Sequence, residues 1–376
     1  MKLIYEIGLA GIVGGSFVIE CKEPYLPPEI NNVKNYLVVD GALHIGSDST
    51  YITLSRTRSL QDSVPNIPEL NAKVAVVGQN GEHYDLNALG NGVYATDFLG
   101  LSPNERCQLL ITTADGKRYQ ADSIPVLNSP PIDSVSWRQD TTSVDSKKGV
   151  NIYVTTHDPR NSTWYYRWEY QETYEYHAAY DAFYFFVNGT VIPRQPDEQT
   201  FICWKSRSST ELLLGSSASL QEDLIFENPL VFIPAGTQPL SVLYSLLVKQ
   251  TALTREAYDY LQSLRKNTEL TGSIFDPQPS QNQGNIRCLD DANEPVLGYV
   301  YASTVQQQRI YISYRIIEHW GYEHKGCILF SGGDEQGRRG YVPVSVAAFT
   351  TWWTFPQCAD CTMDGGSTTK PAYWPN

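Results

Sequence analysis

Cys21 is the residue whose position indicates the most definite chemistry. An apolar stretch, residues 3–19, follows a single Lys2, and a polar, proline-containing segment, residues 22–29, follows the cysteine. A positive start, an apolar run and then a cysteine are typical of a secreted lipoprotein, whose thiol is joined to lipid through a thioether. The run is shorter than the roughly 20 residues that span a bilayer as a helix. We therefore predict a lipoprotein signal peptide over residues 1–20 and lipidation of Cys21.

The residues around Cys21 also permit a second interpretation. Glu20 occupies the position where a small residue usually precedes the lipidated cysteine, and Glu6 lies inside the apolar stretch. The alternative is a plain signal peptide, or a wrongly placed start, with Cys21 an ordinary cysteine. Mass spectrometry of the mature N-terminus distinguishes the two.

Residues 164–177 concentrate aromatic side chains at a period of two, which predicts a long amphipathic strand. One face begins with Trp164, Tyr166, Trp168 and Tyr170, as expected for a strand that faces a core. An acidic residue then interrupts this face, and the aromatic residues beyond it are candidates for an exposed edge. Rings beside polar groups suit sugar faces and peptide backbones, although the same residues would also pack a core. The candidate ligand-binding residues are Glu172, Tyr174, Tyr176, His177 and Tyr180.

The seven cysteines are an odd number, and lipidation of one would leave six. In an exported protein some of the six are expected to pair. Cys107 alternates with apolar residues in a strand-like run, which predicts a buried free thiol. The pair at 358 and 361 indicates a disulfide that holds the loop-rich tail. The disulfide candidates, whose pairing the sequence leaves open, are Cys203, Cys327, Cys358 and Cys361.

The remaining metal-capable residues lack the spacing of a metal site. The cysteines of residues 358–361 have no second pair to complete a zinc site. The two glutamates and two histidines of residues 318–324 have no helix to align them. Three acids within residues 290–294 are more typical of a solvated turn than of a calcium loop. We predict no metal site and no cofactor.

No catalytic motif is present in the sequence. There is no nucleophile elbow, no phosphate-binding glycine loop and no dinucleotide fingerprint. We therefore predict no catalytic residue and a protein that is not an enzyme. The carboxylate pair of a glycosidase has no fixed spacing in sequence, so a surface glycan or peptide hydrolase is kept as the first alternative. A structural or adhesive surface protein is the second.

The composition favours a β-rich protein. Tyrosine is common, at 25 residues, and tyrosine favours strands and half-wet surfaces. The net charge of −13 argues against nucleic acid and against docking on anionic lipid. A lipid anchor is then the simplest route to a membrane.

Turn signals divide the chain into many short strand-like runs, which predict a mainly β fold. Seven runs within residues 35–128 predict an N-terminal β-sandwich that is similar to transthyretin-like or Ig-like modules. Two prolines at 130 and 131 mark the boundary to a larger β-rich domain over residues 129–376. Its one expected helix lies near 254–268, with Thr254 as the N-cap, and a late strand is expected at 296–301. Residues 21–34 are expected to form a tether.

Several ordered blocks carry a resemblance to a known family. They include Tyr36-Leu-Val-Val-Asp-Gly41, Tyr165-Tyr-Arg-Trp-Glu-Tyr170, Gly284-Asn-Ile286, Glu294-Pro-Val-Leu-Gly-Tyr299 and Cys358-Ala-Asp-Cys361. Together these blocks resemble a family of Bacteroidota outer-membrane lipoproteins of unknown function, domain of unknown function 4249. The resemblance covers nearly the whole chain after the signal peptide.

The resemblance implies a function through partners rather than through catalysis. Members of the family are typically encoded beside a SusC-like TonB-dependent transporter, so the implied partner is such an outer-membrane barrel, with other lipoproteins as further candidates. The implied role is accessory: substrate capture, gating or assembly of the barrel complex. Cys21-Lys22-Glu23 also resembles the signal that sends such lipoproteins to the cell surface. The expected location is the outer membrane, lipid-anchored and facing the surface.

Overall fold

The computed structural model is mainly β, which confirms the predicted fold class. It describes residues 35–46, 48–58, 67–140, 148–269, 284–318, 320–347 and 350–375. The predicted signal peptide, Cys21 and the tether lie outside the described residues. None of the helices in the described ranges is both long enough and apolar enough to cross a membrane.

The first module is a β-sandwich built mostly from residues 37–127. Buried residues alternate along its strands, for example Leu37, Val39 and Leu43, and they form one core with Ile52 and Leu109. This alternation is the period-two pattern that indicates strands with one face inward. The strands are β1 (Leu37–Ile45), β2 (Thr50–Arg56), β3 (Ile67–Pro68), β4 (Lys73–Gly78), β5 (His83–Gly90), β6 (Val93–Thr96), β7 (Arg106–Thr112), β8 (Arg118–Ala121) and β9 (Ile124–Leu127).

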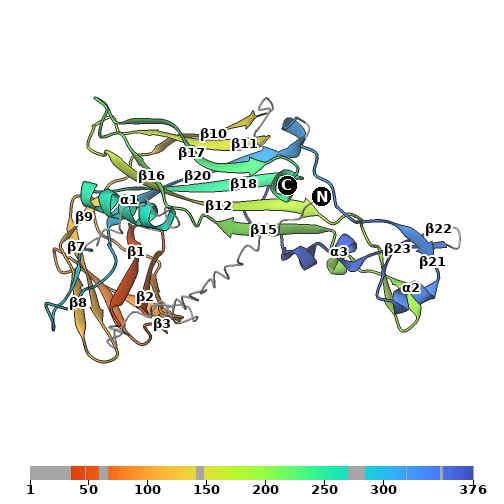
Figure 1. The fold of residues 1–376 in the computed structure, drawn as a ribbon, viewed down its shortest axis with the longest axis horizontal. Coiled ribbons are helices and arrows are strands. Elements are labelled where there is room, and N and C mark those ends of the chain that lie inside the picture. Colours follow the sequence, from red (N-terminus) through yellow and green to blue (C-terminus); the bar gives the residue numbers. More distant parts are fainter. Residues whose placement is uncertain are drawn as a thin grey trace, which may run out of the picture.

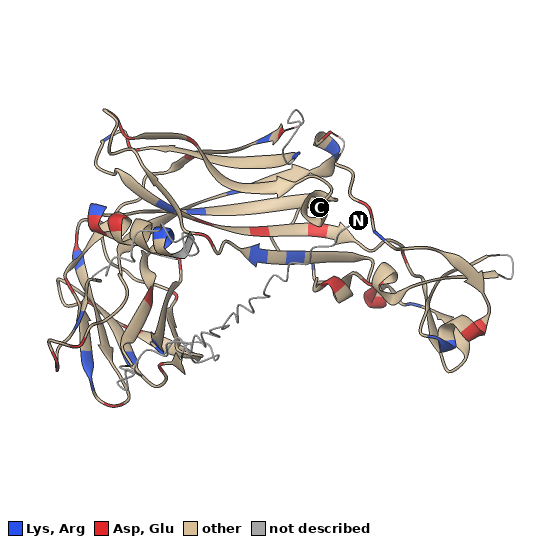
Figure 2. Ribbon diagram, viewed as in Figure 1, with Lys and Arg blue, Asp and Glu red and all other residues tan. Residues whose placement is uncertain are grey.

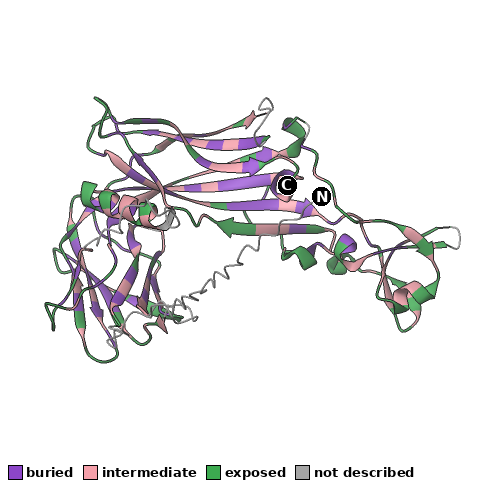
Figure 3. Cartoon of the chain, in the orientation of Figure 1, coloured by how far each residue is buried: buried purple, intermediate pink, exposed green. Residues whose placement is uncertain are grey.

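The second module packs a three-stranded sheet against the end of a larger sheet. The small sheet has the order β10-β11-β17, and the large one runs β15-β12-β18-β20, with β16 paired to one end of β12. Purple, buried positions alternate along the facing strands in Figure 3. The strands are β10 (Ile132–Asp140), β11 (Gly149–His157), β12 (Tyr165–His177), β15 (Ile202–Ser208), β16 (Leu213–Ser216), β17 (Leu224–Pro234), β18 (Leu243–Ala252) and β20 (Ala302–Ser313).

The two modules are joined through strand pairing as well as through the chain. Strand β1 pairs in parallel with β20 at Leu43–Ala302, so the large sheet of the second module continues into the first. Helix α1 (Arg255–Glu269) covers the place where the modules meet (Figure 1). Thr254 caps this helix, because its Oγ1 accepts a hydrogen bond from the Ala257 amide at 3.1 Å, as predicted.

The division of the chain at residue 128 needs a correction. After α1, the chain returns to the first module, where β19 (Ile286–Cys288) pairs with β8. Ile286, Val296 and Val300 then complete the first core. The strand predicted at 296–301 is also wrong, since this segment makes a single bridge from Leu297 to β1 before β20 begins. Short apolar runs such as this one carry no periodicity that separates a strand from buried irregular chain.

An arm extends from the second module (Figure 1, right), and its C-terminal part is folded where the sequence indicated a loop-rich tail. It combines a two-stranded hairpin with a three-stranded sheet, and the Phe186 and Trp353 rings pack edge to face between them, 5.6 Å apart. Its elements are β13 (Tyr184–Val187), β14 (Thr190–Pro193), β21 (Phe330–Gly332), α2 (Asp334–Arg338), β22 (Val342–Ala347), β23 (Thr350–Thr354) and α3 (Pro356–Ala359). Short 3-10 turns lie at Pro196–Glu198, Gln238–Leu240, Tyr314–Ile316 and Cys361–Asp364.

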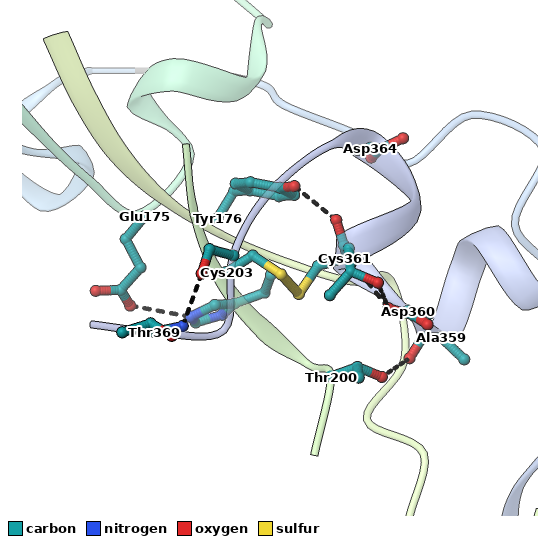
Figure 4. Close-up of a disulfide and its surroundings, with 12 residues drawn as sticks. Glu175, Tyr176, Thr200, Cys203, Ala359, Asp360, Cys361, Asp364 and Thr369 are labelled. Atoms are coloured by element: carbon teal, nitrogen blue, oxygen red, sulfur yellow. Dashed lines mark hydrogen bonds and ion pairs between the residues drawn. A yellow bond between two sulfur atoms is a disulfide. The ribbon is translucent and has the colours of Figure 1, made fainter. Parts of the chain in front are cut away.

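The four candidate cysteines form two disulfides. Cys327 joins Cys358 at the base of the arm, and Cys203 of β15 joins Cys361 in the tail. Beside the second bond, the Tyr176 hydroxyl donates a hydrogen bond to the Cys361 carbonyl at 2.6 Å (Figure 4). Cys107 is a buried free thiol, as predicted, and burial raises its pKa to about 12.

Candidate functional site

The structure places the predicted ligand-binding residues differently from the exposed edge that the sequence indicated. Tyr174 and Tyr176 are 3% and 0% exposed and belong to the core of the second module. The prediction failed because the inward face of β12 continues beyond Tyr170, and Glu172, Tyr174 and Tyr176 are all buried on it. The interrupting acid therefore marks a buried carboxylate, and the aromatic face does not end there.

Glu172 is held at one end of the second module by two partners. Its carboxylate accepts a hydrogen bond from the buried Tyr244 hydroxyl at 2.9 Å. It also forms an ion pair with Arg207, whose Nε lies 2.8 Å away. Burial, then the negative charge of Glu172, raises the pKa of Tyr244 far above its usual value. The Arg207 guanidinium also lies 5.5 Å from the centre of the Tyr174 ring. Figure 2 shows the basic positions of β15 beside the acidic positions of β12.

A pocket of about 460 Å³, here called the end pocket, opens beside this cluster. Glu172 and Tyr174 line it together with Lys205 and Arg207, so two of the five predicted residues do meet at one cavity. However, the charged groups are already engaged, since Lys205 Nζ donates to the Asp364 carbonyl at 2.6 Å. The charged side chains of the end pocket are therefore already paired with other groups of this chain.

The other predicted residues hold the tail and the arm. His177 Nε2 lies 3.1 Å from Glu175, whose second oxygen accepts a hydrogen bond from the Trp374 indole at 2.9 Å. The hydrogen bond with His177, then that with Trp374, holds the pKa of Glu175 below its usual value. The Tyr180 hydroxyl donates to the Cys327 carbonyl at 3.2 Å. These contacts give the polar groups of His177 and Tyr180 structural partners.

A larger cavity of about 1050 Å³ lies where the two modules meet, and we call it the junction pocket. One face of β1 and β2 lines it, and α1 and the segment 284–301 form further walls. The register explains the β-sheet wall: Val38 lies opposite Ser55 and Asp40 opposite Thr53, while Leu37 and Val39 point into the core. The polar lining includes Tyr36, Asp40, Thr53, Ser55, Arg167, Tyr260, Asn267, Glu294, Tyr299 and Tyr301.

Helix α1 contributes residues at helical spacing to the junction pocket. Ala257 and Leu261 pack against Tyr301 and other buried residues between the modules. Tyr260, Leu264 and Asn267 then line the cavity, because residues three or four apart lie on the same side of a helix. The same packing that fixes the helix therefore sets the width of the pocket.

Arg167 reaches the junction pocket from β12 and is held there. Its guanidinium donates to the Tyr301 hydroxyl at 3.1 Å and to Glu169, while its buried Nε has no hydrogen-bond partner within the described residues. Burial alone would lower the pKa of Arg167, but Tyr301, Glu169 and Asp40 outweigh it and raise this pKa. The guanidinium is therefore a fixed positive charge in the pocket wall.

Two glycines bring the pocket walls into backbone contact. A Cβ on Gly298 would lie 1.9 Å from the Val39 carbonyl oxygen, and one on Gly284 would lie 1.7 Å from the Gly298 carbonyl oxygen. Gly298 also has a φ of +127°, a backbone angle that residues other than glycine rarely adopt. The 284–301 wall depends on glycine at these two places.

Two of the three acids of residues 290–294 form ion pairs with basic residues at the start of β8. Asp290 pairs with Arg118 at 2.7 Å, and Glu294 pairs with Lys117 at 2.6 Å. These pairs fasten the returning segment to the first module. Both acids thus have a structural role that explains their presence without a bound cation.

A family model described as Domain of unknown function (DUF4249) matches residues 22–309. The chain belongs to this family. No curated protein matches this DUF4249 chain. The matched segment contains both modules up to the middle of β20, helix α1 and every residue that lines the junction pocket. The sheet β21-β23-β22 and the tail follow it.

The sequence did not indicate the junction pocket of this DUF4249 protein. Its lining comes from five separate segments of the chain, so no local sequence pattern predicts it. Two signals were present: Gly284 and Gly298 flank a polar turn, and Arg167 interrupts an aromatic stretch. Neither signal is specific without the fold that brings them together.

Proposed function

We propose that this protein is a lipid-anchored outer-membrane protein that captures a small polar ligand in the junction pocket and works beside a SusC-like TonB-dependent barrel. The observation that carries the capture role is the junction pocket itself, a cavity of about 1050 Å³ between two β modules. Binding sites are common at such module interfaces, and this volume is at the upper end for small-ligand pockets.

Further support for the location comes from the sequence. Cys21 follows an apolar N-terminal stretch, and Lys22-Glu23 follows the cysteine. A lipid on Cys21, joined to the first module by residues 22–34, would keep the junction pocket near the membrane. The net charge of −13 makes a lipid a more suitable anchor than a basic surface patch.

Purification of the tagged full-length protein in mild detergent tests the proposal. We expect a TonB-dependent barrel to copurify, and we expect Cys21→Ser to move the protein out of the membrane fraction. Mass spectrometry should find an acylated N-terminal cysteine in the native protein alone. A native protein that always purifies without a barrel would contradict the accessory role, and an unmodified Cys21 would contradict the anchor.

A further inference from the structure

Among the charged residues that line the junction pocket, Asp40 is the one described residue whose side chain forms no ion pair, although its charge contributes to the raised pKa of Arg167. Arg167 pairs with Glu169, and Glu294 pairs with Lys117. Arg287 lies 3.3 Å from Asp122. Asp40 is exposed and, within the described residues, its carboxylate takes part in no ion pair or hydrogen bond. Its hydrogen-bonding capacity is therefore open to a ligand.

Aromatic rings accompany this carboxylate in the cavity. Four tyrosines line the pocket, and the ring centres of Tyr260 and Tyr299 are separated by 5.3 Å. Asp40 and Tyr260 line the same cavity, and burial, with a contribution from the charge of Asp40, raises the pKa of the Tyr260 hydroxyl. Tyrosine faces attract cations, and tyrosine hydroxyls accept hydrogen bonds from them.

We propose that the junction pocket binds ligands through a protonated amine, which docks on Asp40 among the tyrosines that line the cavity. The proposal deepens the proposed function, because it names the chemical class of the captured ligand. The carboxylate of Asp40 accepts no hydrogen bond from the described residues, and a free carboxylate binds a cationic ligand group in preference to an anionic one. The guanidinium of Arg167 already pairs with Glu169 and donates to the Tyr301 hydroxyl, so its hydrogen bonds go to these two residues and leave the Asp40 carboxylate open. The neutral remainder of the ligand would fill the rest of the cavity, against Val38 and Leu264.

The amine could belong to a peptide or to an amino sugar, so two pairs of probes test this inference. Each pair compares a free amine with its acetylated form. Isothermal titration of the purified full-length protein in mild detergent compares trialanine with N-acetyl-trialanine, and a glucosamine trimer with an N-acetylglucosamine trimer. Acetylation removes the positive charge and leaves most of each molecule unchanged. We expect at least one amine probe to bind about 10- to 100-fold more tightly than its acetylated counterpart. The pair that shows this difference identifies the source as peptide or amino sugar.

Two variants connect the result to the pocket. Asp40→Asn keeps the size of an exposed side chain and should remove the preference for the free amine. Asp197→Asn is the matched control, because Asp197 is exposed, lies outside the pocket and should leave the preference intact. Equal binding of the free and acetylated probes, a preference that survives Asp40→Asn, or no binding of either amine probe would overturn the inference. A barrel that still copurifies would show that the proposed accessory role stands without it.

Discussion

Gly298→Ala should lower the free energy of unfolding by about 3–5 kcal/mol, which is a large loss for the addition of one methyl group. The added Cβ would lie 1.9 Å from the Val39 carbonyl oxygen, and the backbone φ of +127° is strained for alanine. Relief of the clash would separate the 284–301 segment from β1, where the Val39 amide donates to the Leu297 carbonyl at 2.8 Å. Denaturant unfolding followed by tyrosine and tryptophan fluorescence measures the loss.

Gly81→Ala is the matched control for this prediction. Gly81 also has a positive φ, +94°, but a Cβ added to it would have no atom outside its chain neighbours within 4 Å. Its cost should be limited to the backbone preference, about 1–2 kcal/mol. If the two variants lose equal stability, backbone strain alone explains Gly298, and the close approach of the two pocket walls contributes nothing.

Replacement of Cys203 and Cys361 by alanine should cost about 5 kcal/mol in the chain-entropy model of disulfides. The bond joins residues 158 positions apart, so it restricts the unfolded chain strongly. It also fastens the tail to β15, where Trp204 and Ser367 form a β-bridge. We expect the double variant to unfold at lower denaturant and its tail to become sensitive to protease.

The second disulfide supplies the comparison. Cys327 and Cys358 are only 31 positions apart, so their replacement by alanine should cost about 4 kcal/mol and act mainly on the arm. Proteolysis should then begin within the arm rather than in the tail. An unchanged unfolding midpoint for the Cys203 and Cys361 variant would show that other contacts, such as Tyr176 with Cys361, already hold the tail.

Local sequence patterns predicted many of the strands and the main helix well, but they did not predict which elements pair or pack with one another. Residues 164–177 have the alternation of a strand, and β12 occupies 165–177. Thr254 and the apolar positions that follow predicted α1 to within one residue at each end. The sheet of the arm was missed because its strands are short and lie among glycines, where turn signals dominate. The return of residues 284–302 to the first module depends on contacts that no local pattern records.

The candidate site was also hard to predict, because its residues meet only through contacts between distant parts of the chain. Glu172 looked like the end of an apolar face, and only the position of Tyr244 on the neighbouring strand shows that a buried carboxylate can be stable there. Asp40 looked like an ordinary strand residue. Its place in the junction pocket follows from the positions of Tyr260 and Arg167, which lie 220 and 127 residues away in the chain.

Retention of small molecules by the native protein and by Val38→Trp tests the central claim most directly. Val38 is partly exposed on the face of β1 that lines the junction pocket, so a tryptophan there should fill the cavity without entering the core. Leu89→Trp, at an exposed strand position outside the pocket, is the control. After dialysis against a cell extract, mass spectrometry should find small molecules retained by the native protein and Leu89→Trp and absent from Val38→Trp. Equal retention by all three proteins would contradict the junction pocket as the site of capture.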